Sequence, residues 1–295
     1  MRYKGIMTAL VTPLDKNGSV DEQGLKRIIQ DQLQNGIHSL LVLGGTGEYC
    51  ALSMAQRKQV IDIAMKEVDG KVPVVVGLLS PGLGDCVELG LYAKQAGADS
   101  VMVVTPYYVR PTKEGFIQYF KKLDQALDMP IMLYNIPYKT GIDMGNDVVQ
   151  ALVAEIPNIV SMKVCSHDIG DVIELMNTVG DKISVLCGED YRAVSSFILG
   201  APGAITASSN FLPDVWVKIY DLVQQKQYDE AVSLHKKFFP AMKALYKEGN
   251  PGPLKAALNL INLPVGDVAV PLVSPSESTV EGLKIVIKEL SIPKR

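Results

Sequence analysis

Short apolar runs alternate with amphipathic segments along the first three quarters of the chain. The runs are rich in Val, Ile and Leu and too short for helices, which predicts strands buried on both faces. Between them, apolar residues recur at the spacing of one helix face, as Leu25, Ile28 and Ile29 do. Ser53 followed by Gln56 has the capping-box pattern that begins a helix. The predicted strands occupy residues 6–11, 39–43, 74–77, 100–104, 131–135, 159–163, 184–187 and 204–206.

The predicted helices follow the strands one by one. They occupy residues 21–33, 54–68, 85–95, 113–127, 146–154, 170–179, 191–199 and 213–224. Eight strands that alternate with eight helices predict a parallel sheet closed into a TIM (β/α)8 barrel, a fold of the α/β class. Beyond residue 225 only helical patterns occur, at 228–247, 253–262 and 277–290. We interpret residues 1–225 as the barrel and residues 226–295 as a C-terminal helical extension packed on it.

Composition narrows the class of protein. The chain has 295 residues, 47% of them hydrophobic, and a net charge of -3, as expected for one globular domain with a large core. Mild acidity without a Lys/Arg cluster argues against nucleic-acid binding. The apolar run at 6–11 is too short for a signal peptide, and no membrane-length apolar stretch follows. We therefore expect a cytoplasmic protein without membrane contact.

Cysteines and histidines are few and scattered. They are Cys50, Cys86, Cys165, Cys187, His38, His167 and His235. The cysteines form no CxxC pair, which predicts free thiols in a reducing compartment. The histidines lack the spacing of metal ligands, so we expect no metal site.

Lys163 lies in a run that reads as a buried strand, where an ammonium group is unusual. Strand side chains alternate, so Ile159, Ser161 and Lys163 share one face. A lysine at a strand end often extends its amine to water, which is the ordinary interpretation. Burial instead disfavours the charged form, and the free amine is a nucleophile that condenses with a keto group to a Schiff base.

The ends of the neighbouring strands favour the catalytic interpretation, because barrel active sites lie there. Tyr134 ends the preceding strand and can lie beside Lys163, where a phenol serves as a proton shuttle; the alternative is a core aromatic with a paired hydroxyl. The Gly44-Gly45-Thr46-Gly47 turn offers backbone N–H groups and one hydroxyl, which suit a carboxylate. It has neither the P-loop lysine nor the Rossmann spacing.

With these residues in place, the chain resembles the dihydrodipicolinate synthase / N-acetylneuraminate lyase family of class I pyruvate aldolases, closest to its dihydrodipicolinate synthase branch. The resemblance runs from Gly5 to the C-terminal helices. It is carried by Gly44-Gly45-Thr46-Gly47-Glu48, Thr105-Pro106-Tyr107-Tyr108 through Arg110-Pro111, Tyr134-Asn135-Ile136-Pro137, Lys163, Gly203-Ala204-Ile205-Thr206 and Asn250-Pro251-Gly252-Pro253-Leu254-Lys255.

The resemblance implies a role for each catalytic position. Lys163 would form the Schiff base with pyruvate, or with the keto carbon of a 2-oxo acid, and no other cofactor or metal would be needed. Tyr134 would transfer protons. Tyr108 would reach across a subunit interface to complete a proton relay, which implies a homodimer or a homotetramer built of dimers. The pocket would be lined by Gly45, Thr46, Lys139, Gly188 and Ile205, with Thr46 on the pyruvate carboxylate.

Two positions depart from the synthase branch. Gly45 stands where a threonine or serine joins the two relay tyrosines, so the relay is broken or bridged by water. Lys139 occupies the position at which an arginine binds the carboxylate of the second substrate. It has the same charge but cannot form the bidentate hydrogen bonds of a guanidinium group. Met54, Arg57 and Pro81 occupy the feedback positions, which predicts little inhibition by lysine.

We therefore predict an enzyme that condenses pyruvate with an aldehyde, or cleaves a 2-oxo acid to pyruvate, in the manner of dihydrodipicolinate synthase. One alternative is an N-acetylneuraminate or 2-keto-3-deoxy sugar-acid aldolase. Another alternative is a pyruvate-binding regulatory paralogue with weak turnover, because Gly45 lacks the hydroxyl of the proton relay. A phosphate-binding or metal-dependent barrel is disfavoured, because Glu189 and Asp190 put acids after the seventh strand.

Overall fold

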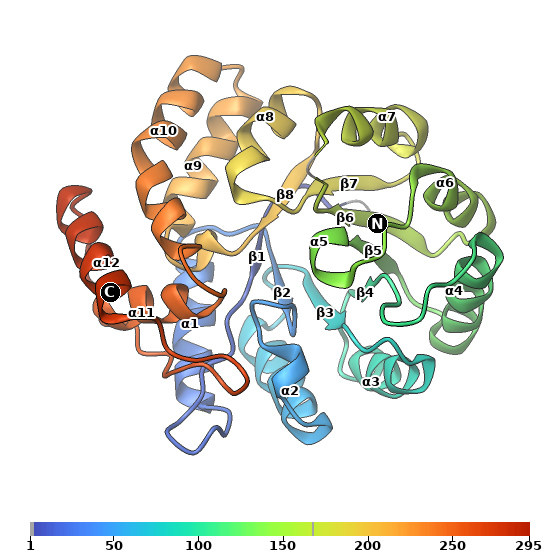
Figure 1. The fold of residues 1–295 in the computed structure, drawn as a ribbon, viewed down its shortest axis with the longest axis horizontal. Coiled ribbons are helices and arrows are strands. Elements are labelled where there is room, and N and C mark those ends of the chain that lie inside the picture. The colour runs from blue at the N-terminus through green and yellow to red at the C-terminus, as the bar shows by residue number, and fades with distance from the viewer. Residues whose placement is uncertain (1–2, 167) are drawn as a thin grey trace.

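A computed structural model describes residues 3–166 and 168–295, so His167 lies outside the described residues. The strands form one closed parallel barrel in the order β1 to β8, and helices surround it (Figure 1). The prediction of a TIM barrel with further C-terminal helices is confirmed. The strands are β1 (Gly5–Ala9), β2 (Ser39–Val42), β3 (Val74–Leu78), β4 (Ser100–Val104), β5 (Ile131–Asn135), β6 (Ile159–Val164), β7 (Ser184–Cys187) and β8 (Gly203–Thr206).

The helices cover the barrel on the outside and continue beyond it. Within the barrel they are α1 (Glu22–Gln34), α2 (Met54–Val68), α3 (Leu83–Gln95), α4 (Lys113–Leu127), α5 (Pro137–Thr140), α6 (Asn146–Glu155), α7 (Ile169–Val179), α8 (Ala193–Ile198) and α9 (Pro213–Gln224). The described residues also form short 3-10 helices, η1 (Tyr49–Ala51), η2 (Asp190–Arg192) and η3 (Ser208–Asn210). After the barrel come α10 (Tyr228–Leu245), α11 (Gly252–Leu260) and α12 (Glu277–Glu289).

Burial explains why the apolar runs form strands. Every residue of β3, with the sequence VVVGL, is buried, because one face fills the barrel and the other packs under the helices. The capping box at Ser53 is present, with the Ser53 side chain and the Gln56 side chain each bonded to the other residue's backbone. No predicted element end differs from the observed one by more than two residues.

Two features near the carboxyl ends of the strands differ from the prediction. The single helix expected at 191–199 is divided into η2 and α8, because the buried Asp190 carboxylate accepts from the backbone N–H groups of Ala207 and Ser208. These bonds hold a tight turn before the helix begins. A short helix that was not predicted, α5, begins at Pro137 directly after β5. It places Tyr138 and Lys139 over the end of the barrel.

The C-terminal helices pack on the side of the barrel formed by α9 and α1 (Figure 1). Helix α10 lies against α9, and α12 lies against α10 and α11. An ion pair between Lys255 of α11 and Glu48, with 2.5 Å between Nζ and Oε1, ties this extension to the loop after β2. Among the residues with a described position, no helix is long and apolar enough to span a membrane.

Candidate active site

Lys163 is the penultimate residue of β6 and lies on the inside of the barrel. Its side chain is buried, with 8% of its surface exposed, and β5 pairs with β6 so that Tyr134 lies opposite Lys163. The Lys163 Nζ lies 4.7 Å from the centre of the Tyr134 ring. The predicted neighbours are therefore together, and the amine does not extend to open water.

A cavity of about 360 Å³ opens around this pair at the carboxyl ends of the strands. Seven of the eight predicted site residues line it, and they are Gly45, Thr46, Tyr134, Lys139, Lys163, Gly188 and Ile205. They come from five different strand ends and from α5, as expected for a barrel active site. The eighth predicted residue, Tyr108, does not line this cavity.

Tyr134 is enclosed in the wall of this cavity. Burial raises the pKa of its phenol well above the ordinary value, and the neighbouring Cys165 contributes to the shift. Tyr134 is therefore a protonated hydroxyl near neutral pH, which is the form that donates a proton. Cys165 also lines the cavity and donates to the Gly188 carbonyl at 3.4 Å. Burial raises the pKa of this thiol, so it remains protonated as well.

Gly188 makes room for the lysine. A Cβ at this position would collide with Cys165 Sγ and come within 3.0 Å of Lys163 Cε. A side chain there would displace the Cys165 thiol and crowd the Lys163 side chain. The glycine therefore contributes to the site by leaving space rather than by offering a functional group.

The loop after β2 is a tight turn that exposes Thr46 to the cavity. The Glu48 N–H donates to the Gly45 carbonyl at 3.2 Å, and Glu48 has the left-handed φ of 56°. Thr46 is 6% exposed, and its hydroxyl accepts a bond of 3.0 Å from Asn250 Nδ2. A Cβ at Gly45 would meet no atom within 4 Å, so this position has space for a side chain that the sequence lacks.

Lys139 supplies a second cation to the cavity. Burial lowers its pKa, and the charge of Lys163 lowers it further. No carboxylate of the described residues lies within ion-pair distance of Lys139. Beside it, the Tyr138 hydroxyl donates to Glu189 Oε1 at 2.9 Å. Lys139 lines the cavity without an ion-pair partner, so it favours an anionic ligand group in this part of the cavity.

Tyr108 does not reach the cavity of its own chain. It lies in the loop after β4 with a φ of 74°, and 94% of its surface is exposed. A second cavity, of about 380 Å³, adjoins the first, since both are lined by Gly45, Tyr134 and Lys139. The rest of its wall is mainly apolar and includes Leu79, Val104, Ile136, Pro271 and Leu272.

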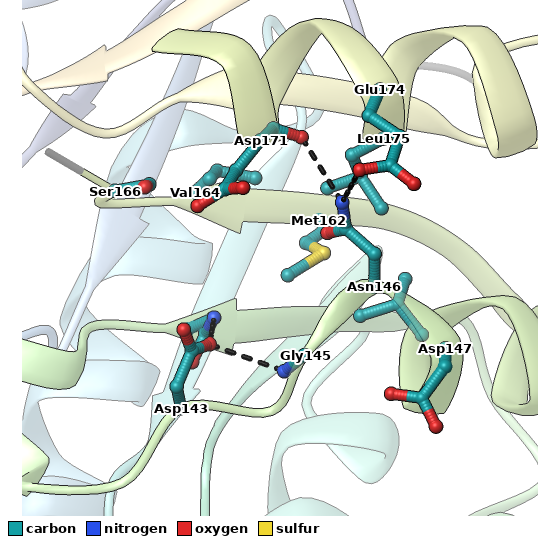
Figure 2. A pocket seen from close by; sticks show the side chains of 12 residues that line it. Asp143, Gly145, Asn146, Asp147, Met162, Val164, Ser166, Asp171, Glu174 and Leu175 are labelled. Atoms are coloured by element: carbon teal, nitrogen blue, oxygen red, sulfur yellow. Dashed lines mark hydrogen bonds between the residues drawn. The ribbon is translucent and has the colours of Figure 1, made fainter. Parts of the chain in front are cut away.

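A third pocket, of about 350 Å³, lies behind β6 on the helix side (Figure 2). Met162 and Val164 line it, which agrees with their predicted place on the strand face opposite Lys163. Its rim is acidic, and Asn146 Nδ2 bonds to the Asp171 carbonyl and to Glu174 Oε2 (Figure 2). Neither Lys163 nor Tyr134 lines this pocket, so the nucleophilic chemistry is not there. In the described parts of the chain, no three His, Cys, Asp or Glu side chains gather as metal ligands do.

Fold and site together define a class. A (β/α)8 barrel whose cavity holds a buried lysine beside a phenol has the nucleophile and the proton donor of a Schiff-base enzyme. The family model described as the dihydrodipicolinate synthetase family matches residues 2–290. The chain belongs to this family, and is thus a class I pyruvate-dependent lyase or synthase. Enzymes of the family bind pyruvate covalently and use no metal or other cofactor.

Relatives and solved structures agree over nearly the whole chain. A protein of Methanococcus aeolicus named 4-hydroxy-tetrahydrodipicolinate synthase is 35% identical over 98% of this chain and 99% of its own. The dihydrodipicolinate synthase of Thermotoga maritima has a TM-score of 0.95 at 34% identity, over 99% of this chain and 100% of its own. The Acinetobacter baumannii enzyme, solved with pyruvate, has a TM-score of 0.94 at 33% identity, over 98% and 99%.

Proposed function

We propose that this chain joins pyruvate to an aldehyde through a Schiff base on Lys163, as a 4-hydroxy-tetrahydrodipicolinate synthase or a near paralogue does. The observation that carries the proposal is the buried Lys163 amine next to the Tyr134 ring, within a cavity that also holds Thr46 and Lys139. The cavity is large enough for pyruvate and a small second substrate.

The reaction follows from the groups at hand. The Lys163 amine adds to the C2 carbonyl carbon of pyruvate, and the carbinolamine loses water to give an iminium ion. The Tyr134 phenol donates the proton with which the hydroxyl leaves as water. The phenolate then takes a proton from the C3 methyl group. This gives an enamine whose C3 attacks the aldehyde carbon, while the Tyr134 phenol donates its proton to the aldehyde oxygen. Water then adds to the iminium carbon, the C–N bond breaks, and the product leaves Lys163 behind as a free amine while the released proton returns to the Tyr134 phenolate.

Thr46 and the adjoining backbone of the loop are the proposed binding site of the pyruvate carboxylate. Lys139 is the proposed partner of a carboxylate on the second substrate, because this cation lines the cavity and no carboxylate of the described residues pairs with it. Gly188 and Ile205 line the space between these two ends. A lysine ammonium cannot form the two parallel hydrogen bonds that an arginine guanidinium forms with a carboxylate. A second substrate bound by Lys139 is therefore less tightly oriented.

Tyr108 is proposed to act in the site of a second copy of the chain, in a homodimer or a homotetramer of dimers. The apolar cavity beside Gly45 and Tyr134 is its proposed place. Mixing two inactive variants, Lys163→Ala and Tyr108→Phe, tests this. In the mixed dimer one site has an intact Lys163 and receives an intact Tyr108 from its partner, so activity returns. If the mixture stays inactive although subunits exchange, Tyr108 does not act in trans.

A sugar-acid aldolase is the second candidate, favoured by Tyr138, which lines the cavity, and by the Glu189 carboxylate to which it donates. A hydroxyl and a carboxylate there suit a substrate that carries several hydroxyl groups. Two assays distinguish the synthase from the sugar-acid aldolase. One measures pyruvate consumption with aspartate semialdehyde, and the other measures pyruvate release from 2-keto-3-deoxygluconate and from N-acetylneuraminate. Turnover of aspartate semialdehyde alone supports the synthase. Pyruvate binding with no turnover of any of them supports a regulatory paralogue instead.

We further infer a cytoplasmic protein whose barrel ends near residue 225. The described cysteines are all free, as is typical of a reducing compartment. The gap between α9, which ends at Gln224, and α10, which begins at Tyr228, supports the boundary between the barrel and the C-terminal extension.

A further inference from the structure

The loop that faces the cavity from β2 is bound to the C-terminal extension at two places. Asn250 Nδ2 donates to the Thr46 hydroxyl at 3.0 Å, across 204 positions of sequence. Five residues further on, Lys255 pairs with the buried Glu48 and donates to the Asp267 carbonyl at 2.8 Å. The Ala269 N–H donates to the other Glu48 oxygen at 2.7 Å. The start of α11 is therefore held rigidly against the turn that contains Thr46.

The bond from Asn250 fixes the direction in which the Thr46 hydroxyl donates. An amide nitrogen can only donate, so it occupies a lone pair of the hydroxyl oxygen and leaves the hydroxyl proton free. That proton has no acceptor among the described side chains and backbone groups, and Thr46 lines the cavity. A hydroxyl that already accepts one bond is also a better donor for the next.

The other end of the amide points to the same conclusion. Asn250 Oδ1 is buried and has no hydrogen-bond partner among the described residues, and Asn250 lines both cavities beside Lys163. A buried unpaired acceptor is unfavourable by about 1–3 kcal/mol, so it is rare without a ligand to pair with. A partner for this oxygen must donate a hydrogen bond, as a hydroxyl or water does and a carboxylate does not, so the Thr46 proton is the contact left for the carboxylate.

We propose that Asn250 is a positioning residue of the pyruvate-carboxylate subsite, which holds the Thr46 hydroxyl as a donor toward the bound carboxylate. The C-terminal extension thus completes the active site rather than only covering the barrel. This inference rests on the proposed function, since it assigns pyruvate to the cavity.

Two substitutions separate this role from a structural one. Asn250→Ala removes the bond to Thr46, and the pyruvate concentration for half-maximal borohydride trapping should rise about tenfold, as for a lost hydrogen bond to a charged group. Asn250→Asp has nearly the same shape, but its carboxylate accepts the Thr46 proton and repels pyruvate. It should therefore bind pyruvate more weakly than the alanine variant, by about tenfold again. A purely structural Asn250 predicts the reverse order.

A double-mutant cycle with Thr46→Val shows whether Asn250 acts through Thr46. In the valine background Asn250→Ala should change half-saturation by less than about twofold, because the partner is already lost. Asn259→Ala is the control: this residue lies on α11, its side chain bonds to the Val265 N–H and the Gly266 carbonyl, and half-saturation should be unchanged. Half-saturation reports on the folded fraction alone, so partial unfolding does not hide the result.

The outcomes distinguish the two proposals. An adduct on the parent chain with unchanged half-saturation in both Asn250 variants, or full additivity with Thr46→Val, overturns the role of Asn250. No adduct on the folded parent overturns the proposed function instead.

Discussion

Replacing Lys255 with methionine should destabilise the fold strongly. The Lys255 side chain is 2% exposed and its partner Glu48 is 0% exposed, so the substitution leaves a buried carboxylate with only the Ala269 N–H as donor. Breaking a buried ion pair in this way costs about 3–5 kcal/mol. For 295 residues the unfolding entropy is about 0.6 kcal/mol/K, so the Tm should fall by about 5–8 °C.

The assay is thermal unfolding followed by circular dichroism at fixed protein concentration and pH. The matched control is Lys284→Met, which removes an ion pair to Glu281 of similar length, 2.6 Å, whose side chains are 51% and 65% exposed. Exposed pairs contribute at most about 1 kcal/mol, so its Tm should change by less than about 2 °C. Equal shifts in the two variants would refute the claim that the buried pair holds the C-terminal extension to the loop after β2.

Three further predictions concern the site and the pH dependence of stability. Gly45→Ser should raise kcat by about tenfold because there is space for a relay hydroxyl, while Gly45→Ala should not; equal rates in steady-state assays would contradict this. Lys139→Met should raise the KM for an anionic acceptor about ten- to hundredfold but leave pyruvate trapping intact, and a loss of trapping would count against its assignment. Burial lowers the pKa of His235, so the unfolded state binds more protons below about pH 6.5 and stability falls as the pH drops through that range. The Tm of His235→Gln, measured from pH 7.5 to 5.5, should fall less than that of the parent; an equal fall would contradict the sign.

The regular part of the fold could be predicted from local pattern. Apolar runs of strand length and helical stripes between them determine a parallel barrel, because each pattern is a property of neighbouring residues. The short helix α5 was missed, since four residues that begin at Pro137 carry no helical period. The division between η2 and α8 was missed as well, because it depends on bonds from Asp190 to a loop seventeen and eighteen positions away.

The site, too, could be predicted only where local pattern and barrel geometry determine the position of a residue. Lys163, Tyr134 and Thr46 could be placed together, because strand ends of a barrel meet at one edge. Asn250 stood in a recognised motif, but its bond to Thr46 spans 204 positions and no local pattern predicts it. Cys165 was predicted to be a free thiol; it is buried, and its contact with the cavity comes from the turn beyond β6.

The central claim is that the Lys163 amine forms a Schiff base with pyruvate. Intact-mass spectrometry after incubation with pyruvate and borohydride, followed by peptide mapping, tests it most directly. Lys163→Ala and Lys139→Met are the comparison variants, because both lysines line the cavity. We predict one reduced pyruvyl adduct on the parent and on Lys139→Met, located on Lys163, and none on Lys163→Ala. An adduct that maps to Lys139, or no adduct on the folded parent, would contradict the account.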